Sequence, residues 1–279
     1  MMCATCGCGD DQAVTTLAGH SHPHDHTHSH QHDDGLAHTH TVSLEQKVLA
    51  KNDLVAHGNR QWLAERDITA FNVTSSPGAG KTTLLERTIR ELGSDLPIAV
   101  VEGDQETLLD AERIRAAGAH AIQVNTGAGC HLDAEMIHHA LEILDPEPES
   151  LLFIENVGNL VCPAMFDLGE LCKVVVVSVT EGADKPLKYP HMFAAAGLVI
   201  VNKIDLLPYV DFDLEQFRAY ARSINSGITI LPLSATTGEE VAQWYDWMKH
   251  TRAFHSKRFR QSIDKTITLG VDQKSAPHK

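Results

Sequence analysis

One segment of the chain joins glycine, lysine and threonine in an order suited to binding phosphate. It reads Ser-Ser-Pro-Gly-Ala-Gly-Lys-Thr-Thr and covers residues 75–83. Glycines let backbone N–H groups converge on phosphate oxygens, while Lys81 would reach the β and γ phosphates and Thr82 would bind Mg²⁺. The general pattern has glycine where this chain has Ser75, so a structural glycine-rich turn is the alternative. We predict a nucleotide-binding loop formed by Pro77, Gly78, Ala79, Gly80, Lys81, Thr82 and Thr83.

The string Asn202-Lys203-Ile204-Asp205 follows an apolar run, and the carboxyl end of such a strand is where open α/β sheets bind ligands. The Asp205 carboxylate only accepts hydrogen bonds, and guanine offers it two adjacent donors that adenine lacks. Lys203 would lie along the purine, and Asn202 would tie this loop to the phosphate loop. A backbone N–H of Ser234-Ala235 would meet guanine O6, although a simple turn explains that pair equally well. The predicted ligand is GTP or GDP.

Acidic residues lie at the ends of two further predicted strands, in the strings Val-Glu-Gly-Asp at 101–104 and Phe-Ile-Glu-Asn-Val-Gly at 153–158. Beside a phosphate loop, such an acid holds the water shell of Mg²⁺ or a lytic water, and a nearby glycine senses the γ-phosphate. We assign the first role to Asp104, a supporting catalytic role to Glu155 and the γ-phosphate contact to Gly158. A helix N-cap or a solvated loop carboxylate is the alternative.

The amino terminus is rich in metal-binding side chains. Cys3, Cys6 and Cys8 place three thiols close enough for one metal ion, and thiolates mixed with nitrogen donors can favour nickel over zinc. A flexible tail follows, with neutral imidazoles that suit several weak, exchanging metal sites; a solvated spacer is the alternative. The histidines of this tail are His20, His22, His24, His26, His28, His30, His32, His38 and His40.

A second metal site is predicted inside the main domain. Cys130-His131 follows a glycine-rich turn, and Cys162 follows the segment that begins at Glu155. Both segments lie at expected strand ends, so this metal would lie close to the γ-phosphate. A buried lone cysteine usually packs as a small apolar residue, which is our interpretation of Cys172.

Composition excludes several classes of protein. The 279 residues carry a net charge of −14, which disfavours nucleic acid as a partner. No run approaches the roughly 18 apolar residues of a membrane helix, and no secretory leader is evident, so we expect a cytoplasmic protein without membrane insertion. Six cysteines in that compartment favour metal binding over disulfides.

Short apolar runs alternate with amphipathic segments between about residues 68 and 235, which predicts an α/β P-loop fold with a mostly parallel sheet flanked by helices. We expect a flexible Cys/His-rich tail over 1–43, a GTPase domain with N-terminal helices over 44–256 and a polar tail over 257–279. The expected strands are 70–75, 98–102, 121–125, 150–156, 173–179, 198–202 and 229–233. The expected helices are 81–92, 108–117, 133–144, 214–224 and 238–250, preceded by one or two from residue 44.

Together, the strings at 75–83, 155–163, 202–205 and 3–8 resemble the HypB family of hydrogenase nickel-incorporation GTPases. The similarity runs from Cys3 to about Thr251. Members of this family often carry another residue in place of the first glycine of the phosphate loop, the position that is Ser75 in this chain. The resemblance implies a GTPase of the signal-recognition and MinD-like class that dimerises on GTP and helps load nickel into the [NiFe]-hydrogenase large-subunit precursor. It also implies the nickel accessory protein HypA as a partner.

The resemblance assigns further roles. Cys3, Cys6 and Cys8 would form a tight nickel site, and Cys130, His131 and Cys162 would bind Zn²⁺ or Ni²⁺ at the GTP-dependent dimer interface. Lys185 would contact the nucleotide across the dimer or remain a surface lysine. No arginine finger is identifiable, so we expect slow turnover. The competing hypotheses are a nickel storage protein with a regulatory GTPase domain and a urease-type accessory GTPase.

Overall fold

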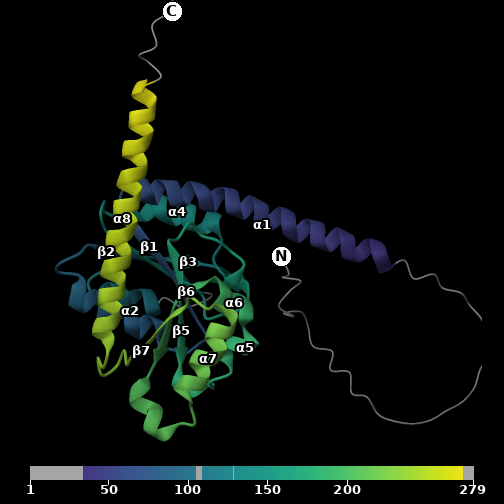
Figure 1. The fold of residues 1–279 in the computed structure, drawn as a ribbon, viewed down its shortest axis with the longest axis vertical. Helices are drawn as coiled ribbons and strands as arrows, with labels where there is room; N and C mark the ends of the chain where they lie inside the picture. The colour runs from purple at the N-terminus through teal and green to yellow at the C-terminus, as the bar shows by residue number, and fades with distance from the viewer. Residues whose placement is uncertain (1–33, 105–108, 128, 273–279) are drawn as a thin grey trace, which may run out of the picture. The chain divides into compact units, whose positions relative to one another are not determined.

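The protein is described from a computed structural model, in which residues 34–104, 109–127 and 129–272 are placed (Figure 1). The chain divides into two compact units, Met1–Lys51 and Asn52–Lys279. The predicted ligands Cys3, Cys6 and Cys8 and the histidines from His20 to His32 lie outside the described residues. The sheet and the two internal candidate sites belong to the second unit.

Seven strands form one sheet in which every pairing is parallel, which confirms the predicted α/β architecture. The strand order is β3-β2-β4-β1-β5-β6-β7, so the strand before the phosphate loop is central. Parallel pairing brings the carboxyl ends of all strands to one edge. The strands are β1 Thr69–Ser75, β2 Ile98–Asp104, β3 His120–Asn125, β4 Leu151–Glu155, β5 Cys172–Ser178, β6 Ala196–Asn202 and β7 Thr229–Pro232.

Helices cover both faces of this sheet because successive residues of a strand point to opposite faces. Phe71 on β1 belongs to the core cluster that includes residues of α2, α3 and α8, whereas Ala70 belongs to the cluster with α1 and α4. A third cluster joins β5 and β6 to α6 and α7. The helices are α1 Asp34–Glu65, α2 Lys81–Leu92, α3 Leu109–Ala116, α4 Ala134–Leu144, α5 Lys185–Lys188, α6 Pro190–Ala195, α7 Leu214–Ile224 and α8 Val241–Asp272, with 3-10 turns η1 Cys162–Ala164, η2 Val179–Glu181 and η3 Ile204–Tyr209.

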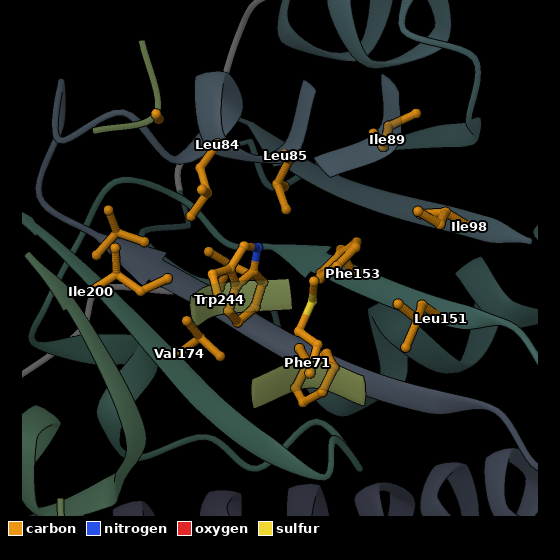
Figure 2. Close-up of a cluster of buried hydrophobic side chains, with 14 of the residues drawn as sticks. Phe71, Leu84, Leu85, Ile89, Ile98, Leu151, Phe153, Val174, Ile200 and Trp244 are labelled. Carbon is orange, nitrogen blue, oxygen red and sulfur yellow. The ribbon is translucent and has the colours of Figure 1, made fainter. Parts of the chain in front are cut away.

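Trp244 anchors α8 to the sheet and to α2 (Figure 2). Its buried ring lies 6.2 Å from the ring of Phe71 and 6.3 Å from that of Phe153, measured between centroids. Its indole N–H donates to the Thr88 hydroxyl at 3.0 Å. Because Thr88 lies on α2, the same contact supports the helix that follows the phosphate loop.

Both terminal helices are longer than the sequence predicted. Helix α8 continues to Asp272, whereas we expected a polar tail from Lys257. Helix α1 begins at Asp34, ten residues before the expected start, and includes His38 and His40. Once a helix is nucleated by a packed segment, each added residue gains a backbone hydrogen bond, so polar flanks can extend it. Within the part of the chain that is placed, no helix has the length and apolar character needed to cross a membrane.

Candidate functional site

The predicted phosphate loop connects the end of β1 to the start of α2. Gly78 and Gly80 adopt positive φ angles of 74° and 99°, a region that glycine enters without steric cost. A Cβ atom on Gly80 would also overlap the side-chain amide of Asn202. Two independent constraints therefore require glycine at position 80. Helix α2 begins directly after the loop, so its N-terminus lies at the predicted phosphate position.

Asn202 joins the predicted base-binding loop to the phosphate loop. Its amide nitrogen donates to the carbonyl of Ala79 at 2.9 Å, and its amide oxygen accepts from the backbone of Lys203 and of Ala235 at 2.8 and 2.9 Å. Lys203 Nζ donates to the carbonyl of Gly78 at 2.7 Å. These contacts hold three segments of the sequence in one place, as the predicted role of Asn202 requires.

The predicted base-binding residues differ in whether their hydrogen-bonding atoms already have partners. Asp205 Oδ1 is buried and has no hydrogen-bond partner among the described residues, which leaves an acceptor ready for a ligand. The N–H of Ser234, however, donates to the carbonyl of Glu239 at 2.9 Å. The N–H of Ala235 is already given to Asn202. A contact with guanine O6 would therefore require the N–H of Ser234 to leave Glu239, or the N–H of Ala235 to be shared between Asn202 and the base.

Glu155 lies directly beside the reactive side chains of the phosphate loop. Thr82 donates its hydroxyl to Glu155 Oε1 at 2.6 Å, and Lys81 Nζ lies 3.3 Å from the same oxygen. Glu155 is buried at the end of β4, next to β2, which ends at Asp104. Hydroxyl and carboxylate oxygens are the donors that Mg²⁺ prefers. The oxygens of Thr82 and Glu155 are thus suited to Mg²⁺, and Asp104 ends the strand beside them.

Glu102 is an additional acidic residue that the sequence interpretation did not select. It pairs in register with Glu155 on the neighbouring strand and is almost completely buried. Its pKa is raised to about 8, first by burial and then by the nearby carboxylates of Glu155 and Asp104, against a smaller lowering by Lys81. A charged residue within a strand buried on both faces was the available signal.

Cys130, His131 and Cys162 lie close together, as the predicted internal metal site requires. Their ligand atoms lie within 4.8 Å of one another. The two Sγ atoms are 2.8 Å apart, and Cys130 Sγ is 3.6 Å from His131 Nδ1. Burial lowers the pKa of His131, which favours the neutral imidazole that binds metals. Two thiols and one imidazole match the donors of nickel or zinc.

Short-range hydrogen bonds shape the turn that carries Cys130. The N–H of Gly129 donates to the carbonyl of Thr126 at 2.8 Å, and the N–H of Gly127 donates to Asn125 Oδ1 at 2.7 Å. Gly127 has a positive φ of 56°. Phe166 lies over the His131 ring with a centroid separation of 3.9 Å, which fixes the orientation of the imidazole.

Cys172 lies outside this cluster, at the start of β5. Burial raises the pKa of its thiol to about 12. A thiol that stays protonated is a poor ligand and nucleophile. This agrees with its interpretation as a packing residue.

Lys185 contacts the phosphate loop of its own chain. Its Nζ donates to the Ser76 hydroxyl at 2.9 Å and lies 2.8 Å from Glu181 Oε2. In this structure Lys185 is therefore a half-buried, paired residue beside the nucleotide loop. A contact across a dimer would require it to leave these partners.

A parallel sheet with a glycine-rich loop between its central strand and a helix defines a P-loop nucleotide-binding protein. Residues 69–232 match the family model for the CobW/HypB/UreG nucleotide-binding domain. The chain is 54% identical over 230 residues to the hydrogenase maturation factor HypB of Azotobacter vinelandii, covering 82% of this chain and 75% of that relative. It belongs to the HypB family of hydrogenase maturation factors.

Two solved structures agree with this assignment. HypB from Helicobacter pylori in complex with nickel superposes with a TM-score of 0.70 at 35% identity, covering 74% of this chain and 97% of that one. Hydrogenase maturation factor HypB from Archaeoglobus fulgidus gives a TM-score of 0.68 at 42% identity, with coverages of 73% and 99%.

Proposed function

We propose that this protein is a GTP-hydrolysing nickel metallochaperone acting in the cytoplasm. The observation that carries the proposal is the loop after β4, which serves both candidate sites. Glu155 contacts Lys81 and Thr82 at its start, and Cys162 contributes a metal donor at its end. A change of nucleotide in one site is therefore linked by a few residues of chain to the other.

In the nucleotide site, Lys81 neutralises the β and γ phosphates and Asp205 recognises guanine. Thr82 and Asp104 would hold Mg²⁺, and Glu155 would accept hydrogen bonds from its water shell. When bound, Mg²⁺ supplies charge neutralisation for the phosphates. In the present contacts Glu155 bonds to Lys81 and Thr82, so GTP binding replaces these bonds with bonds to phosphate and metal.

In the metal site, two thiols and His131 bind nickel or zinc as cargo. We propose that GTP closes a homodimer across this edge of the sheet and that hydrolysis loosens the metal. The metal then passes to the [NiFe]-hydrogenase large-subunit precursor, with the nickel accessory protein HypA as a partner. The amino-terminal cysteines and histidines would collect nickel upstream of this transfer. Relatives named as hydrogenase maturation factors, one of them in complex with nickel, support this assignment.

The test measures nickel and zinc binding together with oligomeric state, in the presence of GDP or of a non-hydrolysable GTP analogue. A full-length variant with serine at positions 3, 6 and 8 removes the amino-terminal thiols, and a competing chelator masks weak histidine sites. The same variant with Cys162→Ala is the matched control. We expect one metal per chain in the first variant, none in the control, and a metal affinity and dimer fraction that depend on the nucleotide.

Metal binding that disappears with the amino-terminal thiols and ignores the nucleotide would contradict the proposal. The protein would then be better described as a nickel store with a regulatory GTPase domain. Normal GTP hydrolysis by Lys81→Ala would overturn the nucleotide assignment independently of the metal result.

A further inference from the structure

Two asparagines of the loop after β4 hold the backbone on either side of His131. Asn159 Nδ2 donates to the carbonyl of Cys130 at 3.1 Å. Asn156 Oδ1 accepts from the N–H of Leu132 at 3.2 Å. The metal-binding histidine is therefore the single residue between two points of attachment to the same neighbouring loop.

The attachment through Asn156 is anchored to the centre of the sheet. The side chain is buried, its amide donates to Asn72 Oδ1 on β1 at 3.2 Å, and its backbone N–H donates to Val73 at 2.9 Å. Asn72 in turn donates to Glu170, which pairs with the buried Lys173 at 2.5 Å. A fully paired buried network of this kind resists displacement.

The attachment through Asn159 lies next to the phosphate loop instead. Its neighbour Gly158 packs against Pro77 so closely that a Cβ atom on Gly158 would lie 3.2 Å from the Pro77 ring and 3.3 Å from its backbone. Asn159 itself is half-buried, and its further bonds stay within its own loop, to Val157 and Val161. One residue thus contacts the phosphate loop, and the next residue holds Cys130.

We propose that Asn159 is a positioning residue that transmits the nucleotide state to the metal site. A nucleotide-driven shift of Gly158 displaces Asn159 and, with it, the carbonyl of Cys130, while Leu132 stays bonded to Asn156. The peptide around His131 then turns relative to the two thiols. Nickel and zinc differ in preferred geometry and respond to such a turn. This inference rests on the proposed function, because it presupposes that both ligands bind.

The experiment compares Ni²⁺ affinity with Mg²⁺–GDP and with a Mg²⁺–GTP analogue in the full-length chain with serine at positions 3, 6 and 8. The test variants are Asn159→Ala and Asn159→Asp; the second keeps the size but cannot donate to the Cys130 carbonyl. The control Asn125→Ala loosens the same metal loop from β3, because Asn125 accepts from Gly127, but leaves the Asn159 bond intact. Thiolate-to-nickel absorption reports the coordination geometry in each state.

We expect the parent to show a ratio of the two nickel affinities of about 5-fold or more, as is typical of coupled sites. Both Asn159 variants should bind nickel and nucleotide but bring this ratio to within about twofold of unity, with identical absorption spectra in the two nucleotide states. The added negative charge of Asn159→Asp shifts the nickel affinity by a similar factor in the GDP state and in the GTP-analogue state. The ratio of the two affinities therefore still reports the coupling. The control should keep the parent ratio.

The outcomes separate this inference from the proposed function. A parent ratio of one contradicts the proposed coupling of nucleotide and metal itself. A parent ratio that survives both Asn159 substitutions overturns the role of Asn159 alone. Loss of the ratio in Asn125→Ala as well would also overturn it, because general loosening of the metal loop would then suffice. By thermodynamic reciprocity, nickel must change the affinity for the GTP analogue by the same factor, which gives a second reading of each variant.

Discussion

Replacing Glu102 with glutamine should remove a pH-dependent loss of folding stability. The carboxyl group has a pKa of 4.5 when solvated and about 8 in the folded protein, chiefly because it is buried and secondly because Glu155 lies opposite. Between these values the folded state holds one proton more than the unfolded state. Stability therefore falls as pH rises, by about 1.4 kcal/mol per pH unit at most.

The expected difference follows from the two pKa values. Between about pH 5.5 and 7.5 the parent should lose about 2.5 kcal/mol more unfolding free energy than Glu102→Gln. The assay is urea unfolding at several pH values, with chelator present and nucleotide absent. Glu142→Gln, which changes an exposed carboxylate on α4, controls for the loss of one charge. Parallel pH profiles for the parent and Glu102→Gln would refute the inferred burial of a protonated carboxyl.

Three further substitutions test the site and its supports. Asp205→Asn should weaken GTP binding by about 10- to 100-fold, because a charge-assisted acceptor for guanine is lost, and equilibrium titration with a fluorescent GTP measures this. Gly80→Ala should destabilise the protein by about 1–3 kcal/mol in thermal unfolding, since it strains a positive φ and displaces Asn202. Thr88→Val should cost about 1–3 kcal/mol in urea unfolding, because it leaves the buried Trp244 N–H without its acceptor.

The sheet was largely predictable because its signal is local. Runs such as 173–179 are apolar on both faces, which is typical of strands covered by helices on two sides, and all seven expected strands are present. Helix ends were less predictable. The polar sequence after Lys257 has no apolar period, so nothing local indicates that α8 continues to Asp272.

Site residues that belong to a local sequence motif could be predicted. Contacts between residues far apart in the sequence could not. The glycines of the phosphate loop and the trio of Cys130, His131 and Cys162 follow from residue type and spacing. The contact of Lys185 with Ser76 joins residues 109 positions apart in the chain, and no local pattern indicates it. The burial of Glu102 has a local signal, because its strand is apolar on both faces, but its position opposite Glu155 depends on which strands become neighbours.

The position of β3 has a consequence for how the protein opens. Among the described strands, β3 lies at one edge of the sheet and pairs with β2 only, whereas β1 is central. Edge strands exchange their amide hydrogens through local fraying at a lower free-energy cost than central strands. The strand that leads to Cys130 can thus separate transiently while the strand that leads to the phosphate loop remains protected. A local fluctuation of this edge strand would therefore move Cys130 without unfolding of the core.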